Sequence, residues 1–219
     1  MHIGVLGGTG PAGKAVATRL ASVGVDVTIG SRSIDRALAT CDELCERWPD
    51  RNLPLHPGEN VEAAAADLVI VGTPWDAAAP TAASVATLLE GKVLISMANA
   101  LARVGEEFLP LIPPRGSVAA SVQAAVPRSM VSAAFHHLPA RELVDIDRDL
   151  EADVLVCSDY PEATAATAEL ISKVPGLRAL DAGLLSAATA IEALTPVLLN
   201  INIRYRTRAS IRLTNLEIR

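Results

Sequence analysis

Seven residues near the N-terminus constrain the fold more than any other part of the chain. The segment GGTGPAG, residues 7–13, follows the apolar run HIGVL and opens a stretch, residues 11–23, with helical periodicity. Glycines at such a junction let the main chain turn tightly and approach a pyrophosphate, whose charge then lies against the N–H groups of the helix N-terminus. Pro11 suits the first turn of that helix, where its missing N–H is no loss. The segment predicts a dinucleotide site, and a glycine-rich turn kept only for packing is the alternative.

The first half of the sequence alternates short apolar runs with Ala-rich helical stretches, which is the pattern of βαβ units. Half of the residues are hydrophobic but only 3% are aromatic, so Ala, Val, Leu and Ile must build a core that suits close packing of helices on a sheet. We therefore predict an α/β fold, a Rossmann-type doubly wound parallel sheet with a smaller C-terminal α/β part. Strands are expected at residues 2–6, 25–30, 52–56, 67–72 and 92–97, and helices at 11–23, 33–48, 60–66 and 77–89.

Three prolines between residues 109 and 117 predict a pause in regular structure. Beyond them the sequence either completes the same sheet or forms a small second lobe, and we place a boundary near Arg128, between residues 1–127 and 128–219. In this second half we expect helices at residues 118–125, 161–173 and 186–201, strands at 129–135, 153–158 and 177–181, and a final strand in the alternating tail 208–218.

Charge and composition narrow the class of partner. The formal net charge of −6 argues against a surface devoted to nucleic acid or to an anionic membrane, so small-molecule partners are expected. No apolar run reaches the roughly 20 residues that cross a bilayer, and the N-terminus lacks the pattern of a signal peptide, which predicts a cytoplasmic protein. The three cysteines include no CxxC pair and no neighbouring His cluster, so reduced thiols are expected rather than a disulfide framework or a metal site.

The end of the second predicted strand indicates which dinucleotide is bound. Proteins that hold NAD tend to place Asp or Glu there for the ribose 2′-hydroxyl, whereas this chain has Ser31 and Arg32, with Arg36 one helical turn onward. A guanidinium can donate two parallel charge-assisted hydrogen bonds to a 2′-phosphate but has no charge to neutralise on a hydroxyl. This pattern favours NADP over NAD. The alternative is that both arginines are ordinary solvated charges, and Asp35 between them weakens the case slightly.

Two further segments follow strands at the same sheet edge. Thr73, Pro74 and Trp75 follow the fourth strand, and the Trp75 ring could form a wall for a planar group or simply cap the core. His136 and His137 follow the strand after the proline-rich segment, where they could donate to a substrate carbonyl or carry a proton, or merely lie in a surface loop. No nucleophile–base set and no metal cluster has sequence support, which indicates that a cofactor supplies the chemistry.

Taken together, these motifs resemble one known family. The shared motifs are GGTGxxG, GSR, PW after the fourth strand, H-x-[IL]-PA, VC-x-D at residues 156–159 and LDAG-x-LS…E-x-LTP-x-LLN at residues 180–200. With these motifs the chain is similar to the NADPH-dependent coenzyme F420 reductases. The likeness runs from the first residue to about Arg206, and the last block is its most specific part. It implies hydride transfer between NADP(H) and the 5-deazaflavin coenzyme F420, with 1–127 as the NADP-binding domain and 128–219 completing the deazaflavin site.

The resemblance also implies roles for individual residues. The pyrophosphate and nearby ribose would be held by Thr9, Gly10, Pro11 and Ala12, and the 2′-phosphate by Ser31, Arg32 and Arg36, the last of which is often Lys in the family. The nicotinamide would be lined by Thr73, Pro74, Met97, Ala98 and Ala140. The deazaflavin would be bordered by Trp75, His136, Leu138, Pro196 and Asn200.

Alternatives to this function remain at the level of sequence. An NADPH-dependent reductase of a small imine or carbonyl compound would need a proton donor such as His136, and a non-catalytic NADP-binding sensor would transfer no hydride. The tail arginines, Arg204, Arg206, Arg208 and Arg212, could meet the acidic tail of the coenzyme, although a solvated or dimer-contact role is favoured. Family members are commonly dimers, and the apolar helix near its C-terminal end could pack on a second copy, so a homodimer is expected.

Overall fold

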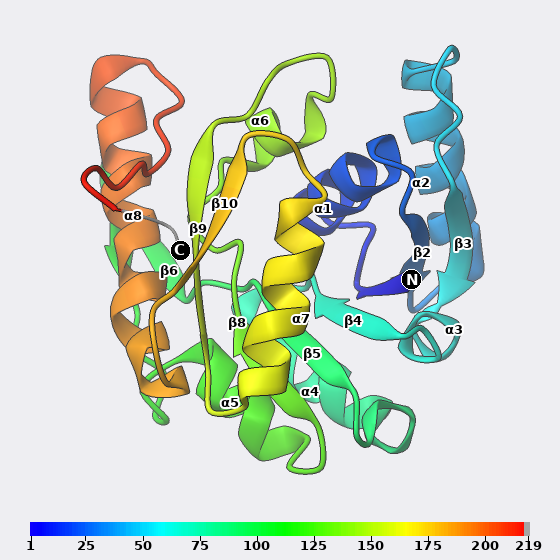
Figure 1. The fold of residues 1–219 in the computed structure, drawn as a ribbon, viewed down its shortest axis with the longest axis horizontal. Helices are drawn as coiled ribbons and strands as arrows, with labels where there is room; N and C mark the ends of the chain where they lie inside the picture. Colours follow the sequence, from blue (N-terminus) through cyan, green and yellow to red (C-terminus); the bar gives the residue numbers. More distant parts are fainter. Residues whose placement is uncertain (217–219) are drawn as a thin grey trace.

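The fold is built on one eight-stranded sheet, seen in a computed structural model that describes residues 1–216 (Figure 1). The strand order is β10-β9-β8-β5-β4-β1-β2-β3. The six strands from β3 to β8 run parallel, whereas β9 runs antiparallel to β8 and carries β10 parallel to itself. The predicted Rossmann-type α/β fold is confirmed. The strands are β1 (His2–Leu6), β2 (Asp26–Ser31), β3 (Leu55–Glu59), β4 (Leu68–Val71), β5 (Val93–Ser96), β8 (Met130–Ala133), β9 (Ala152–Ser158) and β10 (Leu177–Asp181).

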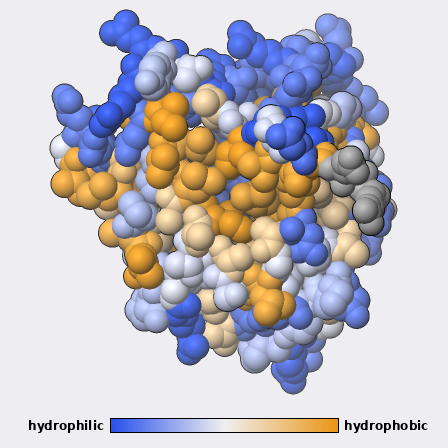
Figure 2. Space-filling view, turned by 60° about the vertical axis from the view of Figure 1, so that its left-hand side comes forward, coloured by the Kyte–Doolittle hydropathy of each residue, from blue (hydrophilic) through white to orange (hydrophobic). Residues whose placement is uncertain are grey.

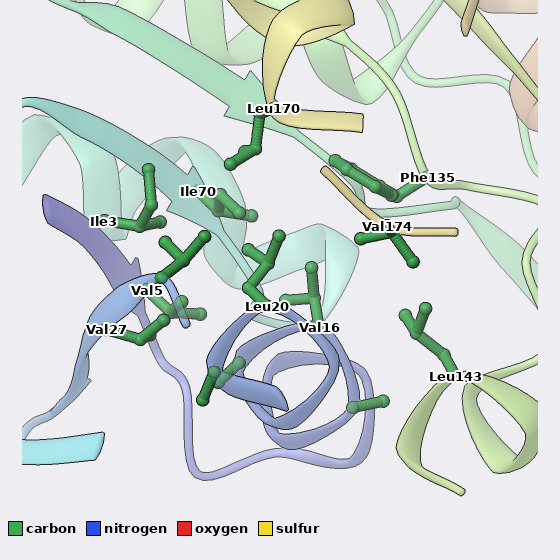
Figure 3. Close-up of a cluster of buried hydrophobic side chains, with 14 of the residues drawn as sticks. Ile3, Val5, Val16, Leu20, Val27, Ile70, Phe135, Leu143, Leu170 and Val174 are labelled. Carbon is green, nitrogen blue, oxygen red and sulfur yellow. The ribbon is translucent and has the colours of Figure 1, made fainter. Parts of the chain in front are cut away.

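Helices cover both faces of this sheet because the central strands are apolar on both sides. Along β4, Leu68 and Ile70 join a core cluster that contains side chains of α1, α2 and α7, whereas Val69 and Val71 join a second cluster that contains side chains of α4 and α5. Figure 3 shows part of the first cluster, in which α1 presents Val16 and Leu20 toward the sheet. The helices are α1 (Pro11–Ser22), α2 (Ile34–Arg47), α3 (Asn60–Ala64), α4 (Trp75–Ser84), η1 (Ala86–Leu89), α5 (Val118–Ala125), α6 (Ala140–Val144), α7 (Pro161–Ser172), η2 (Leu185–Ala187) and α8 (Ala188–Tyr205).

A small antiparallel hairpin was not predicted from the sequence. It consists of β6 (Leu101–Val104) and β7 (Glu107–Pro110), so ordered structure extends to the first residues of the proline-rich segment. The Asn200 side chain of α8 holds the hairpin, because its amide accepts from the Phe108 N–H and donates to the Phe108 carbonyl, both at 2.8 Å. The hairpin thus owes its position to a helix almost a hundred residues away.

The sheet continues across residue 128, because β8 pairs with β5 in parallel register from Val93↔Met130 to Ser96↔Ala133. The edge strand β3 lies a few residues later than expected and includes Pro57, which an edge position tolerates. The predicted tail strand is wrong for residues 208–216, which are irregular, and its last two residues lie outside the described part. Main-chain pairing with the sheet is limited there to the Asp153 N–H, which donates to the Ile211 carbonyl at 2.8 Å.

Candidate active site

The glycine-rich loop has two kinds of glycine. A Cβ on Gly13 would lie 2.7 Å from the Gly8 Cα, so this position is needed for packing within the protein. A Cβ on Gly10 would meet nothing closer than the Gly7 carbonyl oxygen at 3.7 Å. Gly10 precedes Pro11 at the start of α1, where the first helical N–H groups have no partner within the helix. The bare Gly10 therefore leaves open space where an anion can reach those groups.

Four adjoining cavities form one groove that begins at this loop. The first cavity, of about 300 Å³, and the second, of about 330 Å³, share Gly10, Thr73 and Pro74. The second and the third cavity, of about 190 Å³, share Ala12, Met97 and Asn99. The third and the fourth cavity, of about 580 Å³, share Pro139, Ala140 and Leu199. The groove thus runs from the carboxyl ends of the parallel strands to the C-terminal end of α8.

Most residues singled out from the sequence line this groove. Thr9, Ser31, Arg32 and Arg36 line the first cavity, and Pro11, Trp75 and Ala98 line the second, together with the shared residues Gly10, Ala12, Thr73, Pro74 and Met97. His136, Leu138 and Ala140 line the third. Pro196 and Asn200 line none of the four: Pro196 is buried in α8, and Asn200 is committed to the hairpin.

The first cavity has a lining that suits an anion. Arg32 and Arg36 are exposed and, within residues 1–216, neither forms an ion pair. Arg36 lies in the first turn of α2, where the positive end of the helix dipole disfavours a cation. Two free guanidinium groups at a helix N-terminus repel each other and the dipole, and an anion between them relieves both effects. Ser31, buried beside them, adds a hydroxyl.

The third cavity is apolar apart from a few groups, and His136 is the most unusual of these. Both ring nitrogens are buried and, in the described part of the chain, have no hydrogen-bond partner. Burial, and then the neighbouring His137, lower the pKa of His136 to about 3, so the ring is neutral at physiological pH. A neutral imidazole can donate one hydrogen bond and accept another, but it holds no proton to give.

His137 faces away from the groove. Its Nε2–H donates to the Asp153 carbonyl at 2.6 Å, which ties the segment after β8 to β9. Both histidines are only 3% exposed, so the surface-loop interpretation is wrong for this pair. The sequence did not show that one of them would be a structural residue and the other would line a cavity, because adjacent side chains can point in opposite directions.

An unusual backbone conformation precedes His136 at the wall of the cavity. Phe135, at the end of β8, has φ of 66°, a left-handed conformation that bulky residues rarely adopt and that costs roughly 1–3 kcal/mol. Its ring compensates by packing into the first core cluster, where Figure 3 places it near Val174 and Leu170. The buried ring thus holds the turn that His136 occupies.

Several residues in or beside the groove were not predicted from the sequence. Asn60 accepts the Gly7 N–H at 3.0 Å and so supports the phosphate loop from α3. Asn99 and Thr195 line the third cavity; Asn99 was detectable in principle as a polar residue following a parallel strand. Arg19 is buried on α1 and donates to the carbonyls of Leu143, Arg148, Glu142 and Asp145, which fixes α6 beside the groove. Nothing in the sequence distinguishes Arg19 from an exposed helical arginine.

The tail arginines are mostly paired within the chain. Arg204 lies 2.6 Å from Glu107, Arg208 lies 2.5 Å from Glu142, and Arg212 lies 3.6 Å from the buried Asp153. Arg178 makes the closer contact with Asp153, at 2.6 Å. Arg206, at the C-terminal end of α8, and Arg208 both line the fourth cavity. Structural contacts thus account for most of this positive charge.

Comparisons with known proteins agree with this arrangement. The family model described as "NADP oxidoreductase coenzyme F420-dependent" matches residues 2–100. The F420-dependent NADP reductase of Methanocaldococcus jannaschii is 36% identical over 100% of both chains, and that of Methanothermobacter marburgensis is 36% identical over 99% of both. The crystal structure of an Arthrobacter sp. FB24 protein, described as a candidate F420-dependent NADP reductase, has a TM-score of 0.80 at 27% identity, covering 96% of this chain and 99% of that one. By sequence over its whole length, the chain belongs to the family of F420-dependent NADP reductases.

Proposed function

We propose that the protein transfers a hydride between NADP(H) and the 5-deazaflavin coenzyme F420. When bound, the two coenzymes supply the chemistry, which passes a hydride between C4 of the nicotinamide and C5 of the deazaflavin. The observation that carries the proposal is the groove itself: an anion site with two unpaired arginines at one end joins an apolar cavity with a neutral histidine. The full-length identity to reductases of this name supports the same conclusion.

The first two cavities fit NADP. Arg32, Arg36 and Ser31 would bind the 2′-phosphate, which explains arginines at a helix N-terminus. Thr9, Gly10, Pro11 and Ala12 would hold the pyrophosphate against the N-terminus of α1. The Thr73 hydroxyl is buried without a partner among the described residues, so it is free to bind a polar group of the ligand. Thr73, Pro74, Met97, Ala98 and Ala140 would line the nicotinamide.

The third cavity fits the meeting point of two rings. Its small lining residues Ala12 and Ala140 leave room for close approach, and its apolar walls exclude water, which a hydride transfer requires. Trp75, His136 and Leu138 would border the deazaflavin, with His136 as an uncharged part of the wall. Residues from both sides of position 128 line this cavity, in keeping with 1–127 as the NADP-binding part and 128–219 as the part that completes the deazaflavin site.

The proposal is tested by absorbance. Purified protein is mixed with oxidised coenzyme F420 and NADPH, with NADH in a parallel cuvette, and loss of the deazaflavin band is followed. Rapid bleaching with NADPH and much slower bleaching with NADH is expected. Tight NADPH binding without bleaching would overturn the deazaflavin assignment, and transfer to a small imine would then support the alternative reductase.

We further propose that the protein acts in the cytoplasm as a homodimer. The dimer is inferred because an apolar face is open on the single chain. Figure 2 shows apolar side chains gathered on the side of the molecule that carries α8 and the hairpin. Exposed members on these elements and the adjoining loop are Val104, Leu109, Leu111, Ile112, Val197, Ile203 and Tyr205. A patch of this kind is typical of a protein interface.

The helix of residues Leu185–Tyr205 is long and apolar enough to cross a membrane by length and composition, and 22% of its most apolar stretch is buried. This finding differs from the expectation that no apolar segment would be long enough to cross a bilayer. The Glu192, Thr195 and Asn200 side chains of this helix, however, bond to α5, to the loop after β5 and to the hairpin. A helix docked on the domain through three polar side chains favours cover by a second copy over a lipid environment. Light scattering of the wild type should give twice the mass of one chain. The double variant Ile112→Glu with Val197→Glu should have the mass of a single chain. A monomeric wild type would contradict the dimer.

A further inference from the structure

Three segments that are distant in sequence meet at the main-chain carbonyl of His136. The Asn99 Nδ2 donates to this oxygen at 2.9 Å, from the loop that follows β5. The Thr195 hydroxyl, on α8, lies 3.0 Å from the same oxygen and 2.9 Å from the Asn99 Oδ1. The Thr195 hydroxyl thus shares its one proton between two acceptors, and the three groups form one hydrogen-bonded cluster beside the third cavity.

This carbonyl fixes the main chain of a segment that lines the third cavity. On one side of it, Phe135 holds a left-handed backbone conformation. On the other, the His137 ring is bonded to Asp153. Between these two contacts the peptide that follows His136 can still rotate. The strain at Phe135 would favour such movement, because a bulky residue prefers a negative φ. A hydrogen-bonded carbonyl removes that freedom, because rotation of the peptide would break two hydrogen bonds in a buried site.

The Thr195 hydroxyl is directed away from its own helix. A helical threonine can bond the carbonyl one turn back in the same helix. The Thr195 hydroxyl instead reaches off the helix to Asn99 and His136. The same helix is therefore connected to the wall of the third cavity through one side chain.

From this geometry we infer that Asn99 and Thr195 are positioning residues, which hold the main chain around His136 as the wall of the third cavity against which a coenzyme ring binds. The inference rests on the proposed function for its kinetic consequence, but not for its structural one. Neither residue needs to touch a reacting atom. Their effect is exerted through the main chain around His136, and loss of either hydrogen-bonding group loosens this wall of the cavity and lets water reach the buried ring.

Two substitutions of Thr195 separate the hydroxyl from the shape of the side chain. Thr195→Val keeps the branched shape and removes the hydroxyl, whereas Thr195→Ser keeps the hydroxyl. The matched control is Thr18→Val, which removes a buried hydroxyl that bonds only the Lys14 carbonyl of its own helix. Thr195→Val and Asn99→Ala should each lower kcat for hydride transfer by about tenfold to hundredfold, as small misplacements in active sites do. Thr195→Ser and Thr18→Val should stay within about twofold of wild type, well below the effect of such a misplacement.

Binding at the far end of the groove should not change. The Kd for adenosine 2′,5′-bisphosphate, which reaches only the first cavity and the phosphate loop, should equal that of the wild type in all four variants. The double variant Asn99→Ala with Thr195→Val should be no slower than the worse single variant, because both act on one carbonyl. Additive losses, or a Thr195→Ser enzyme as slow as Thr195→Val, would overturn the inference.

A readout without coenzyme keeps the test independent of the proposed function. The chain has four histidines, so their ring signals can be followed by NMR between pH 8 and 5. In the wild type and in Thr18→Val, His136 should stay neutral over this range. In Thr195→Val its ring should begin to titrate toward its ordinary pKa, because it becomes hydrated. An unchanged His136 titration in Thr195→Val would reject the inference even if hydride transfer were confirmed; the shifted titration in a protein that transfers no hydride would reject only the proposed function.

Discussion

The buried carboxylate of Glu192 accepts the main-chain N–H of Val118 at 2.8 Å, and with it the next N–H of α5 at 3.0 Å. Glu192 therefore caps α5 from the middle of α8. Burial outweighs these two hydrogen bonds and raises the pKa of Glu192 to about 7 from an ordinary value of 4.5. The ionised cap is the less stable form inside the protein, although it is the better acceptor.

The Glu192 cap predicts a stability that falls as the pH rises. A raised carboxyl pKa means that the folded state binds more protons than the unfolded state between pH 4.5 and about 7. The stabilisation is fully present below pH 4.5 and is lost as the pH rises through 7, by up to roughly 3 kcal/mol at about 1.4 kcal/mol per pH unit. Urea unfolding of wild type and Glu192→Gln at pH 5 and pH 8 measures it. The wild type should lose stability relative to the variant, and parallel pH curves would contradict the prediction.

His136 predicts a dependence of the opposite sign. Its lowered pKa means that the unfolded state binds the additional proton, so the contribution is present above pH 6.5 and is lost as the pH falls toward 3. His136→Asn retains a donor and an acceptor but does not titrate. The unfolding free energy of the wild type should fall relative to this variant by about 1.4 kcal/mol per pH unit below pH 6.5. The exposed His56 provides the control, and an equal relief of acid sensitivity by His56→Asn would count against burial as the cause.

Arg32 and Arg36 predict selectivity between the two nicotinamide coenzymes. Charge-assisted hydrogen bonds contribute about 1.5–3 kcal/mol each, so the double variant Arg32→Ala with Arg36→Ala should raise KM for NADPH by about a hundredfold or more. KM for NADH should change little because NADH has no 2′-phosphate, and kcat should change little because the lost contacts are the same in the ground state and the transition state. Steady-state kinetics with both coenzymes check this. Arg115→Ala, an exposed arginine outside the groove, should have no effect; equal losses for NADH would argue against 2′-phosphate recognition.

Two glycines of the phosphate loop should respond differently to one methyl group. At Gly10 there is space for a Cβ and φ is an ordinary −78°, so the thermal midpoint of Gly10→Ala should stay near that of the wild type. Its affinity for NADPH should fall by tenfold or more, which corresponds to roughly 1.4 kcal/mol, about the free energy of one hydrogen bond. Gly13→Ala would push against the Gly8 backbone and should destabilise the fold by roughly 1–3 kcal/mol. Calorimetry with and without NADPH separates the two effects. Retained affinity in a folded Gly10→Ala protein would show that the pyrophosphate lies elsewhere.

The sequence predicted those parts of the molecule whose pattern is local. Parallel strands buried on both faces appear as continuous apolar runs such as LVIV in β4, and the loop before α1 has glycines at fixed spacing. The groove residues of the first and second cavities follow from the rule that ligands lie at the carboxyl edge of such a sheet. Most of the candidate site was therefore accessible before the structure.

Features that depend on distant partners were not accessible. The hairpin is held by Asn200, α6 is fixed by Arg19, and the irregular tail meets the main chain of the sheet only at the Asp153 N–H among the described residues. Alternating hydrophobicity in residues 208–216 indicated a strand, but a strand also needs a neighbour with free main-chain groups along its length. Asn99 and Thr195 meet only through folding, since nearly a hundred residues separate them.

The ladder between β5 and β8 has a consequence for movement. It joins the two sides of residue 128 through main-chain hydrogen bonds at the centre of the sheet, so the two walls of the groove cannot swing apart about a hinge without breaking them. Coenzymes must enter and leave past a rigid frame, and only loops and side chains at the rim can yield. Entry and release of the coenzymes should then depend on movement of these rim loops and side chains rather than on opening and closing of two lobes.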